Sequence, residues 1–194
     1  MSESAVTKKI ISDGFKALMM KKHFEKITIS DITAQCGLNR QTFYYHFQDK
    51  YELLNWVLYT DIITPFTKDL TINNWSEKLL NILITLKQNS RFYTNAFNTS
   101  HGDEFRQYFF SAVSNVLSDV IDQLADGFYV DPHDKDFISE FLSYGVSGTV
   151  SKWIKSGMKE SPEAITRYLE NLINDFKRFA VTRYISRNSP YETE

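Results

Sequence analysis

The chain has 194 residues and a net charge of −2, and its residues are 42% hydrophobic and 15% aromatic. This length and composition support an apolar core for one domain, or for a small domain joined to a medium one. The seven Gly and four Pro are few, which argues against an all-β chain with many turns. No apolar stretch approaches the length of about 18 residues that a membrane span needs, so we expect none.

The charge is divided unevenly along the chain. Residues 1–50 carry a net charge of +3, whereas the remaining 144 residues carry −5. A basic N-terminal part could approach a phosphate backbone, whereas the acidic remainder of the chain would be repelled by it. An excess of three positive charges in 50 residues also arises by chance. The single cysteine, Cys36, excludes an internal disulfide, and the polar N-terminus lacks the apolar core of a signal peptide. We therefore expect a cytoplasmic protein.

Two helices are predicted in the first 37 residues. Apolar side chains recur at helical spacing over residues 6–20, which indicates an amphipathic first helix. Thr28 and Asp31 form a capping pair for the second helix, because the hydroxyl can accept a free amide and the carboxylate suits the positive helix end. Gly37 is expected to end that helix, since the sharp turn that follows favours a left-handed backbone.

A short third helix is predicted over residues 40–47, with Asn39 as its cap. Phe43 and Phe47 are four residues apart and share one helix face, so both rings must turn inward. A fourth helix follows, and we expect it to end near Pro65.

Helical periodicity continues to the end of the chain, which predicts an all-α fold of about nine helices. The helices of the second part are expected near residues 75–86, 92–97, 105–124, 135–156 and 161–183. The predicted organisation has three parts: an N-terminal head with its linking helix (1–65), a helical body (66–185) and a polar tail (186–194).

A helix, a turn with Gly37 and a short helix that begins Arg-Gln-Thr have the layout of a helix-turn-helix. The planar guanidinium of Arg40 matches the O6 and N7 atoms of guanine. Gln41 can pair with adenine in the same groove, and the methyl group of Thr42 could meet a thymine. The segment therefore indicates a DNA-reading helix, with an ordinary exposed polar helix start as the alternative.

Further candidate DNA contacts surround this helix. Tyr44 and His46 carry donors for phosphates, and Lys50 lies where the next helix begins. Thr28 and Tyr45 complete the set of candidate DNA-binding residues. Adjacent helical residues cannot both face the core with Phe43 and Phe47, so at least one of the two tyrosines must be exposed.

The segment TISDITAQCGLNRQTFYYHF (residues 28–47), followed by DKYELL (residues 49–54), resembles the N-terminal domain of the TetR family of bacterial regulators. The likeness covers about the first 60 residues. Two departures are Asn39, where Ser or Thr is usual, and Cys36, where a small or aliphatic residue is usual. An Asn can still cap a helix, and a cysteine can serve as a buried hydrophobe.

The resemblance implies a three-helix DNA-binding head joined by a fourth helix to a larger regulatory body. It also implies a homodimer, in which the last two long helices of each subunit pair with their copies as a four-helix bundle. The partner of the dimer would be double-stranded operator DNA. Gly145 and Gly148 in the first of these helices would permit close approach. Part of each apolar stripe must instead cover the chain's own core, and the sequence does not divide the residues between the two tasks.

The second half is similar, less closely, to a branch of the same family that includes regulators of dihydroxyacetone-kinase operons. The similarity rests on the aromatic and leucine pattern of residues 75–97, on residues 144–153 and on Gly157-Met158. Members of that branch can act as activators with a protein co-regulator. The resemblance therefore leaves open two functions: a repressor whose DNA affinity a small-molecule effector changes, and an activator or interaction module that depends on a protein partner.

Other functions have less support. Some aromatic side chains of the body could line an effector cavity, although most should be core: Tyr59, Phe66, Trp75, Phe92, Tyr93, Phe97, Tyr108, Phe109, Phe110 and Trp153. His101 with Asp103 and Glu104, or His133 with Asp134, matches no tight metal-ligand spacing. No catalytic signature or phosphate-binding loop is present, so we expect neither an enzyme nor a cofactor.

Overall fold

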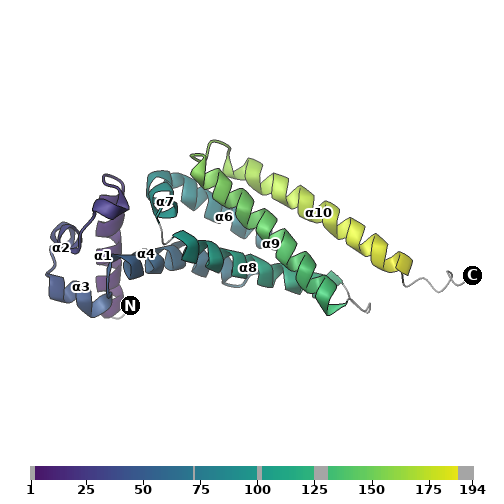
Figure 1. Cartoon of the computed structure of the whole chain (residues 1–194), viewed down its shortest axis with the longest axis horizontal. Helices are drawn as coiled ribbons and strands as arrows, with labels where there is room; N and C mark the ends of the chain where they lie inside the picture. The colour runs from purple at the N-terminus through teal and green to yellow at the C-terminus, as the bar shows by residue number, and fades with distance from the viewer. Residues whose placement is uncertain (1–2, 72, 100–101, 125–130, 188–194) are drawn as a thin grey trace, which may run out of the picture.

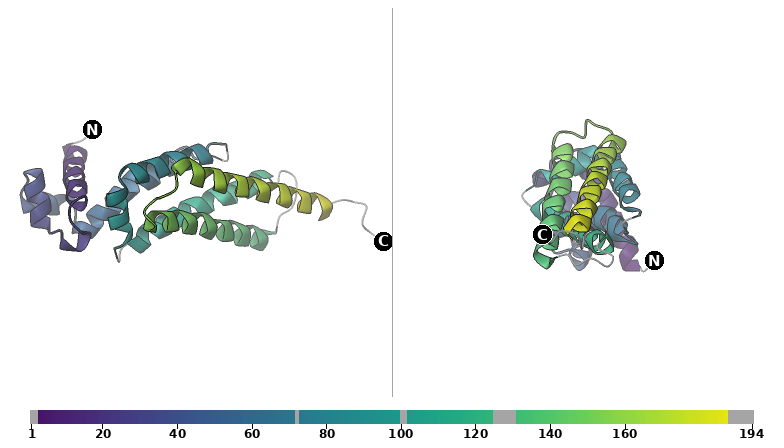
Figure 2. Two further views of the ribbon diagram at one scale, coloured as in Figure 1. Left: turned by 90° about the horizontal axis from the view of Figure 1, so that it is seen from above. Right: turned by 90° about the vertical axis from the view of Figure 1, so that its right-hand side faces the viewer.

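The computed structural model describes residues 3–71, 73–99, 102–124 and 131–187, all of which fold into helices and connecting turns (Figure 1). The molecule is elongated. A small head of three α-helices lies at one end, and five further helices form the body at the other end (Figure 2). The all-helical fold predicted from the sequence is therefore confirmed for the described residues.

The head contains α1 (Glu3–Met19), the short 3₁₀ helix η1 (Phe24–Lys26), α2 (Ile29–Cys36) and α3 (Arg40–His46). Its core is aromatic, with the rings of Phe15 and Phe24 packed edge to face at 6.1 Å between centroids. Burying one such ring stabilises a fold by about 1.5–3 kcal/mol. The fully or almost fully buried side chains of the head are Ile11, Phe15, Met19, Phe24, Ile27, Ile32, Phe43 and Phe47.

One continuous helical run links the head to the body: α4 (Lys50–Leu58), the π-helical segment η2 (Tyr59–Ile63) and α5 (Thr64–Thr67). The run passes the expected end at Pro65 by two residues. Proline lacks the N–H that an α-helix uses, and a wider turn accommodates this loss. The amide of Thr64 accordingly donates five residues back, to the carbonyl of Tyr59. Counting this run once, the described residues contain the nine helices that the sequence predicts, besides η1.

The body consists of α6 (Trp75–Gln88), α7 (Ser90–Phe97), α8 (Gly102–Leu124), α9 (Pro132–Lys155) and α10 (Pro162–Arg187). The most extensive contact between two helices is that of α8 with α9, and α10 packs on α6. Side chains of α9 that the sequence did not mark as core, Ser139, Ser143 and Ser147, are buried. Small side chains allow two long helices to approach closely, which explains why serine is accepted here.

The chain turns between α9 and α10 within the gap predicted between residues 156 and 161. Gly157 has a φ of 84°, so the chain reverses through the left-handed region after α9. The hydroxyl of Ser161 accepts the amide of Ala164 at 3.1 Å and caps α10, whose first residue is Pro162. None of the helices among the described residues is long and apolar enough to span a membrane.

Candidate nucleic-acid interface

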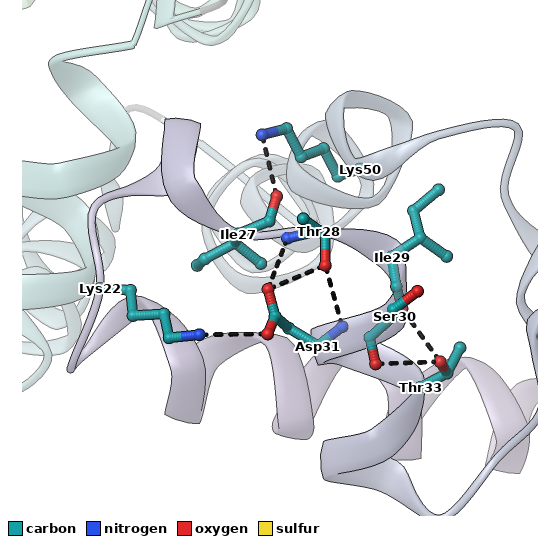
Figure 3. Close-up of polar contacts among 8 residues, drawn as sticks. All are labelled: Lys22, Ile27, Thr28, Ile29, Ser30, Asp31, Thr33 and Lys50. Carbon is teal, nitrogen blue, oxygen red and sulfur yellow. Dashed lines mark hydrogen bonds and ion pairs between the residues drawn. The ribbon is translucent and has the colours of Figure 1, made fainter.

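The start of α2 is fixed by a capping box, shown in Figure 3. The hydroxyl of Thr28 accepts the amide of Asp31 at 3.1 Å, and the carboxylate of Asp31 accepts the amide of Thr28 at 2.9 Å. The ammonium of Lys22 adds an ion pair at 3.1 Å to the other carboxylate oxygen. Hydrogen bonds from the Thr28 amide and hydroxyl, with a smaller contribution from Lys22, lower the pKa of Asp31 to about 2. The predicted capping pair is thus confirmed.

The turn between α2 and α3 is also built as the sequence predicts. Gly37 has a φ of 65°, in the left-handed region, and ends α2. The side-chain oxygen of Asn39 then accepts the amide of Thr42 at 2.7 Å and its hydroxyl at 3.0 Å. The caps at the starts of α2 and α3 therefore restrict the motion of α3 relative to α2. A helix that contacts base edges needs such a fixed orientation.

α1 packs against the end of α2, next to this turn. A methyl group added at Gly14 would lie 2.3 Å from the sulfur of Cys36, so glycine is needed where α1 and α2 meet. The thiol of Cys36 lies 3.5 Å from the carbonyl of Ile10 and is half-buried. Burial raises the pKa of this thiol, so it stays protonated at neutral pH.

α3 has one buried and one exposed face. Phe43 and Phe47 are both buried, as predicted, and pack against each other at 5.9 Å between ring centroids. Arg40 and Gln41 are exposed at the N-terminal end of α3. Tyr44 and Tyr45 are exposed by 49% and 82%. The helix therefore presents a guanidinium, an amide and two phenol groups to the solvent.

Thr42 and His46 are half-buried at the border of this face. Because the hydroxyl of Thr42 is bonded to Asn39, its methyl group is the part left for an apolar contact. Six of the eight predicted DNA-binding residues thus lie on α3, four of them exposed and two half-buried.

The other two, Lys50 and Thr28, have a different role in the structure. The ammonium of Lys50 donates to the carbonyls of Phe24, Glu25 and Ile27 at 3.0, 3.2 and 3.0 Å, and lies 4.5 Å from the centre of the Phe24 ring. All three of its donors are therefore used within the head (Figure 3 shows the bond to Ile27).

The hydroxyl and the amide of Thr28 also donate hydrogen bonds within the head. Its hydroxyl donates to the carboxylate of Asp31 at 2.9 Å, and its amide donates to the same oxygen. A phosphate accepts but does not donate hydrogen bonds, so Thr28 has no free donor to offer it. In the DNA-free structure Thr28 and Lys50 support α2 and the start of α4, and their contact with DNA stays a prediction.

Lys8 on α1 is a cation near α3 that the sequence did not distinguish. Its ammonium lies 5.2 Å from the centre of the Phe47 ring and 5.9 Å from that of Trp56. These rings belong to the C-terminal end of α3 and to α4, so Lys8 adds positive charge near the C-terminal end of α3.

The body contains a small apolar cavity of about 30 Å³. Helical segments from α5 to α10 line it with Phe66, Trp75, Leu79, Val113, Val116, Leu117, Val146 and Ile173. Of the aromatic residues predicted as possible pocket residues, Phe66 and Trp75 therefore line this cavity. Phe92, Tyr93, Phe97, Phe109 and Trp153 are buried core, Tyr59 is exposed and Phe110 is half-buried.

The remaining candidates lie partly outside the described part of the chain. The Tyr108 side chain and the group of His101, Asp103 and Glu104 cannot be placed within it. Among the residues that are described, no group of three potential ligands could hold a metal ion.

Two family models match this helical head and body. Residues 11–57 match the model described as bacterial regulatory proteins, tetR family, and residues 73–175 match the transcriptional regulator C-terminal region of the same family. The second match alone covers more than half of the chain. The protein belongs to the TetR family of transcription regulators, as the sequence resemblance predicted, and is not an enzyme.

Individual relatives point to one branch of the family. The chain is 29% identical over 175 residues to the HTH-type dhaKLM operon transcriptional activator DhaS of Lactococcus lactis, covering 89% of this chain and 91% of that protein. A solved structure of the dihydroxyacetone kinase operon activator DhaS superposes with a TM-score of 0.74 and 28% identity, over 90% of this chain and 98% of that one. The complex of SmeT with triclosan shares the fold, with a TM-score of 0.61 and 19% identity over 90% and 91% of the two chains.

Proposed function

We propose that the protein binds a palindromic operator as a homodimer and reads it with the N-terminal end of α3. The observation that carries this proposal is the two-sided character of α3. Its inward face is fixed by the buried rings of Phe43 and Phe47, while Arg40 and Gln41 are exposed at its N-terminal end. That is the arrangement by which a recognition helix presents side chains to base edges in the major groove.

Each exposed side chain has a chemical role in this proposal. Arg40 pairs with guanine, Gln41 pairs with adenine and the Thr42 methyl group contacts a thymine. Tyr44, Tyr45 and His46 donate to phosphates on either side of the groove and fix the register of the head. Lys8 adds a long-range attraction to the backbone.

The homodimer is supported by apolar side chains that α9 and α10 leave in solvent. Phe137 and Phe141 on α9 are exposed by 69% and 61%, and their rings stack at 6.3 Å. Tyr144, Tyr168 and Leu172 are also more than half exposed. An exposed apolar face of this kind marks an interaction surface, and a second copy of the same face is the simplest partner.

The two glycines of α9 fit the same surface. A Cβ atom added at Gly145 or Gly148 would meet no atom within 4 Å, so both positions face away from the chain's own core. Val146, Val150, Trp153 and Ile154 are buried instead. We accordingly assign the exposed stripe of α9 to the dimer and the buried stripe to the body of its own subunit.

These roles correspond to the division into a head with its linking helix (residues 1–65), a regulatory and dimerisation body (66–185) and a tail (186–194). The small cavity lined by Phe66 and Trp75 is the candidate effector site, since α9 and α10, which carry the proposed dimer face, add Val146 and Ile173 to its apolar wall. At about 30 Å³ it must widen to admit a ligand. An apolar effector bound there would change DNA affinity through the body. We place this activity in the cytoplasm.

A second candidate function is supported by the similarity to DhaS, which is an activator of the dhaKLM operon. In this alternative the protein activates a related operon and depends on a protein co-regulator that docks on the body. Nothing in α3 separates the two functions, because both require the same operator contacts.

The test is a selection of random DNA duplexes with the purified protein at low ionic strength. We expect a palindrome whose half-sites lie about one helical turn (~34–36 Å), or a multiple of it, apart, and an affinity that falls steeply with salt. Failure of the protein to retain any duplex would contradict the proposal. Retention only after addition of a second protein from the same operon would favour the co-regulator.

A further inference from the structure

Asn95 on α7 is a side chain of the body that is bonded to the head at three main-chain atoms. Its side-chain oxygen accepts the amide of Phe24 at 3.0 Å. Its side-chain nitrogen donates to the carbonyls of Met19 and Lys22, at 3.1 and 2.8 Å. Only this orientation of the amide satisfies all three groups, and it uses both donors and the acceptor of the side chain.

The atoms that Asn95 contacts lie where α1 ends. Met19 is the last residue of α1, and Phe24 opens η1. The carbonyls at the end of a helix and the first amides of the next one lack partners within their own helices. His23, at the start of η1, provides no side-chain cap. The end of α1 is therefore completed by a residue of the body, more than 70 positions away in the sequence.

α7 holds the head at a second point. The Phe92 ring packs edge to face against Phe15 in the core of the head, at 6.4 Å between centroids. The hydroxyl of Tyr93 donates to Asp61 in η2 at 3.3 Å, and Asp61 pairs with Lys16 of α1 at 2.5 Å. Consecutive turns of α7 thus contact the middle and the end of α1, the helix that supports α2 and α3.

We propose that Asn95 is a positioning residue that fixes the angle between head and body and thereby selects the spacing of the two operator half-sites. It touches no DNA. This inference rests on the proposed dimer, in which the body fixes the distance between the two heads. Adding one base pair between half-sites moves them apart by about 3.4 Å and rotates them by about 35°, so a rigid dimer must discriminate between spacings.

The expected size of the effect follows from the three hydrogen bonds. Each contributes a factor of about two to ten to an equilibrium. Their loss leaves the packing of Phe92 and the Tyr93–Asp61–Lys16 contacts in place, so the head should stay folded and attached but sample a wider range of angles.

The experiment uses the full-length protein and operators whose half-sites are moved by one and two base pairs in either direction. For the wild-type protein, we expect a two-base-pair change to weaken binding by about tenfold or more. For Asn95→Ala and for the isosteric Asn95→Asp, which cannot donate to the two carbonyls, this penalty should shrink to about threefold or less. Affinity for a single half-site should stay the same, since α3 is untouched.

Asn98→Ala is the matched control. Asn98 is an exposed asparagine at the end of the same helix, and its side chain forms no hydrogen bond with another residue that the structure describes. We expect this variant to keep the wild-type spacing penalty. Circular dichroism and sedimentation serve to check that each variant is folded and has the wild-type oligomeric state.

Three results would overturn the inference. One is a wild-type spacing penalty in Asn95→Ala together with a lower melting temperature, because Asn95 would then only stabilise the head. Another is wild-type behaviour of Asn95→Asp, because hydrogen bonding would then not be involved. The third is a wild-type protein that binds well at every spacing. A wild-type protein that binds no duplex would overturn the proposed function, and this inference with it.

Discussion

The head and the body both expose large side chains, but of different chemistry. On the head, the exposed rings are Tyr44 and Tyr45, which carry hydroxyl groups and lie next to Arg40. On the body, Phe137 and Phe141 have no polar atom to offer the solvent. Exposure alone therefore does not define a binding surface. The head presents a surface suited to a polar, charged ligand, whereas the body presents one suited to another apolar surface.

The two regions also differ in how completely their apolar side chains are covered in a single chain. The head has its phenylalanines buried and its helix ends capped by Thr28, Asn39 and Asp49. The body leaves an apolar stripe along α9 without cover in a single chain. We therefore expect substitutions in the head to change folding and DNA contact, and substitutions on the stripe to change assembly.

The largest expected effect is that of Phe141→Glu on assembly. In a symmetric dimer the substitution is present in both subunits. Losing the burial of each Phe side chain weakens dimerisation by about 1.5–3 kcal/mol, and repulsion between the introduced charges adds to this. We expect the dimer dissociation constant to rise at least about a hundredfold in analytical ultracentrifugation. Tyr45→Glu is the control, since this more exposed residue lies on the head and should leave the assembly unchanged. A dimer that survives Phe141→Glu would contradict the assignment of the stripe.

The next effect is that of Phe43→Ala on the stability of the head. This ring is fully buried, so its removal should cost about 3–5 kcal/mol in the free energy of unfolding, measured by denaturant titration. The neighbouring Tyr44→Ala should cost only about 0.5 kcal/mol, because Tyr44 is exposed, while weakening DNA binding. If the two substitutions destabilised the head equally, the two-sided character of α3 would be wrong.

Lys50→Met distinguishes a structural role of this lysine in the head from a contact with a DNA phosphate. The substitution keeps the apolar stem and leaves three carbonyls without their cation, so it should destabilise the head by about 1–3 kcal/mol. The salt dependence of DNA binding should not change. A phosphate contact would instead lower the salt slope by about one for each head. Lys26→Met, at an exposed lysine of η1, serves as the control for loss of a positive charge.

The smallest effect concerns Asp31 and pH. Because the pKa of this carboxyl is lowered to about 2 in the folded head, its contribution to stability is present above its ordinary pKa of 3.8. The contribution is lost as the pH falls through about 2. We expect the difference in melting temperature between wild type and Asp31→Asn to shrink between pH 4 and pH 2. A constant difference over this range would argue against the ionised capping box.

The sequence was sufficient for structure that depends on near neighbours. The caps by Thr28 and Asn39 act over three residues, and the left-handed turn at Gly37 depends on one residue, so local chemistry determines them. The spacing of Phe43 and Phe47 likewise determines which face of α3 is buried. The buried and exposed faces of α3 were therefore predictable from the sequence alone.

Contacts between distant elements were not predictable. Lys50 meets the carbonyl of Phe24 only because α4 packs against η1, and Asn95 meets the head only because α7 packs against α1. The division of α9 into a buried and an exposed stripe also depends on which neighbours cover it, and its buried serines gave no apolar signal. Periodicity identifies a helix face but not its partner.

The central claim, that α3 reads bases with Arg40, is tested most directly by a base-substitution scan of the selected operator with wild-type protein and Arg40→Ala. We expect Arg40→Ala to cost about 1–3 kcal/mol on the selected operator and to abolish discrimination at one symmetric pair of guanines, while preferences elsewhere persist. An equal loss of affinity on every sequence would make Arg40 a phosphate contact and contradict the account.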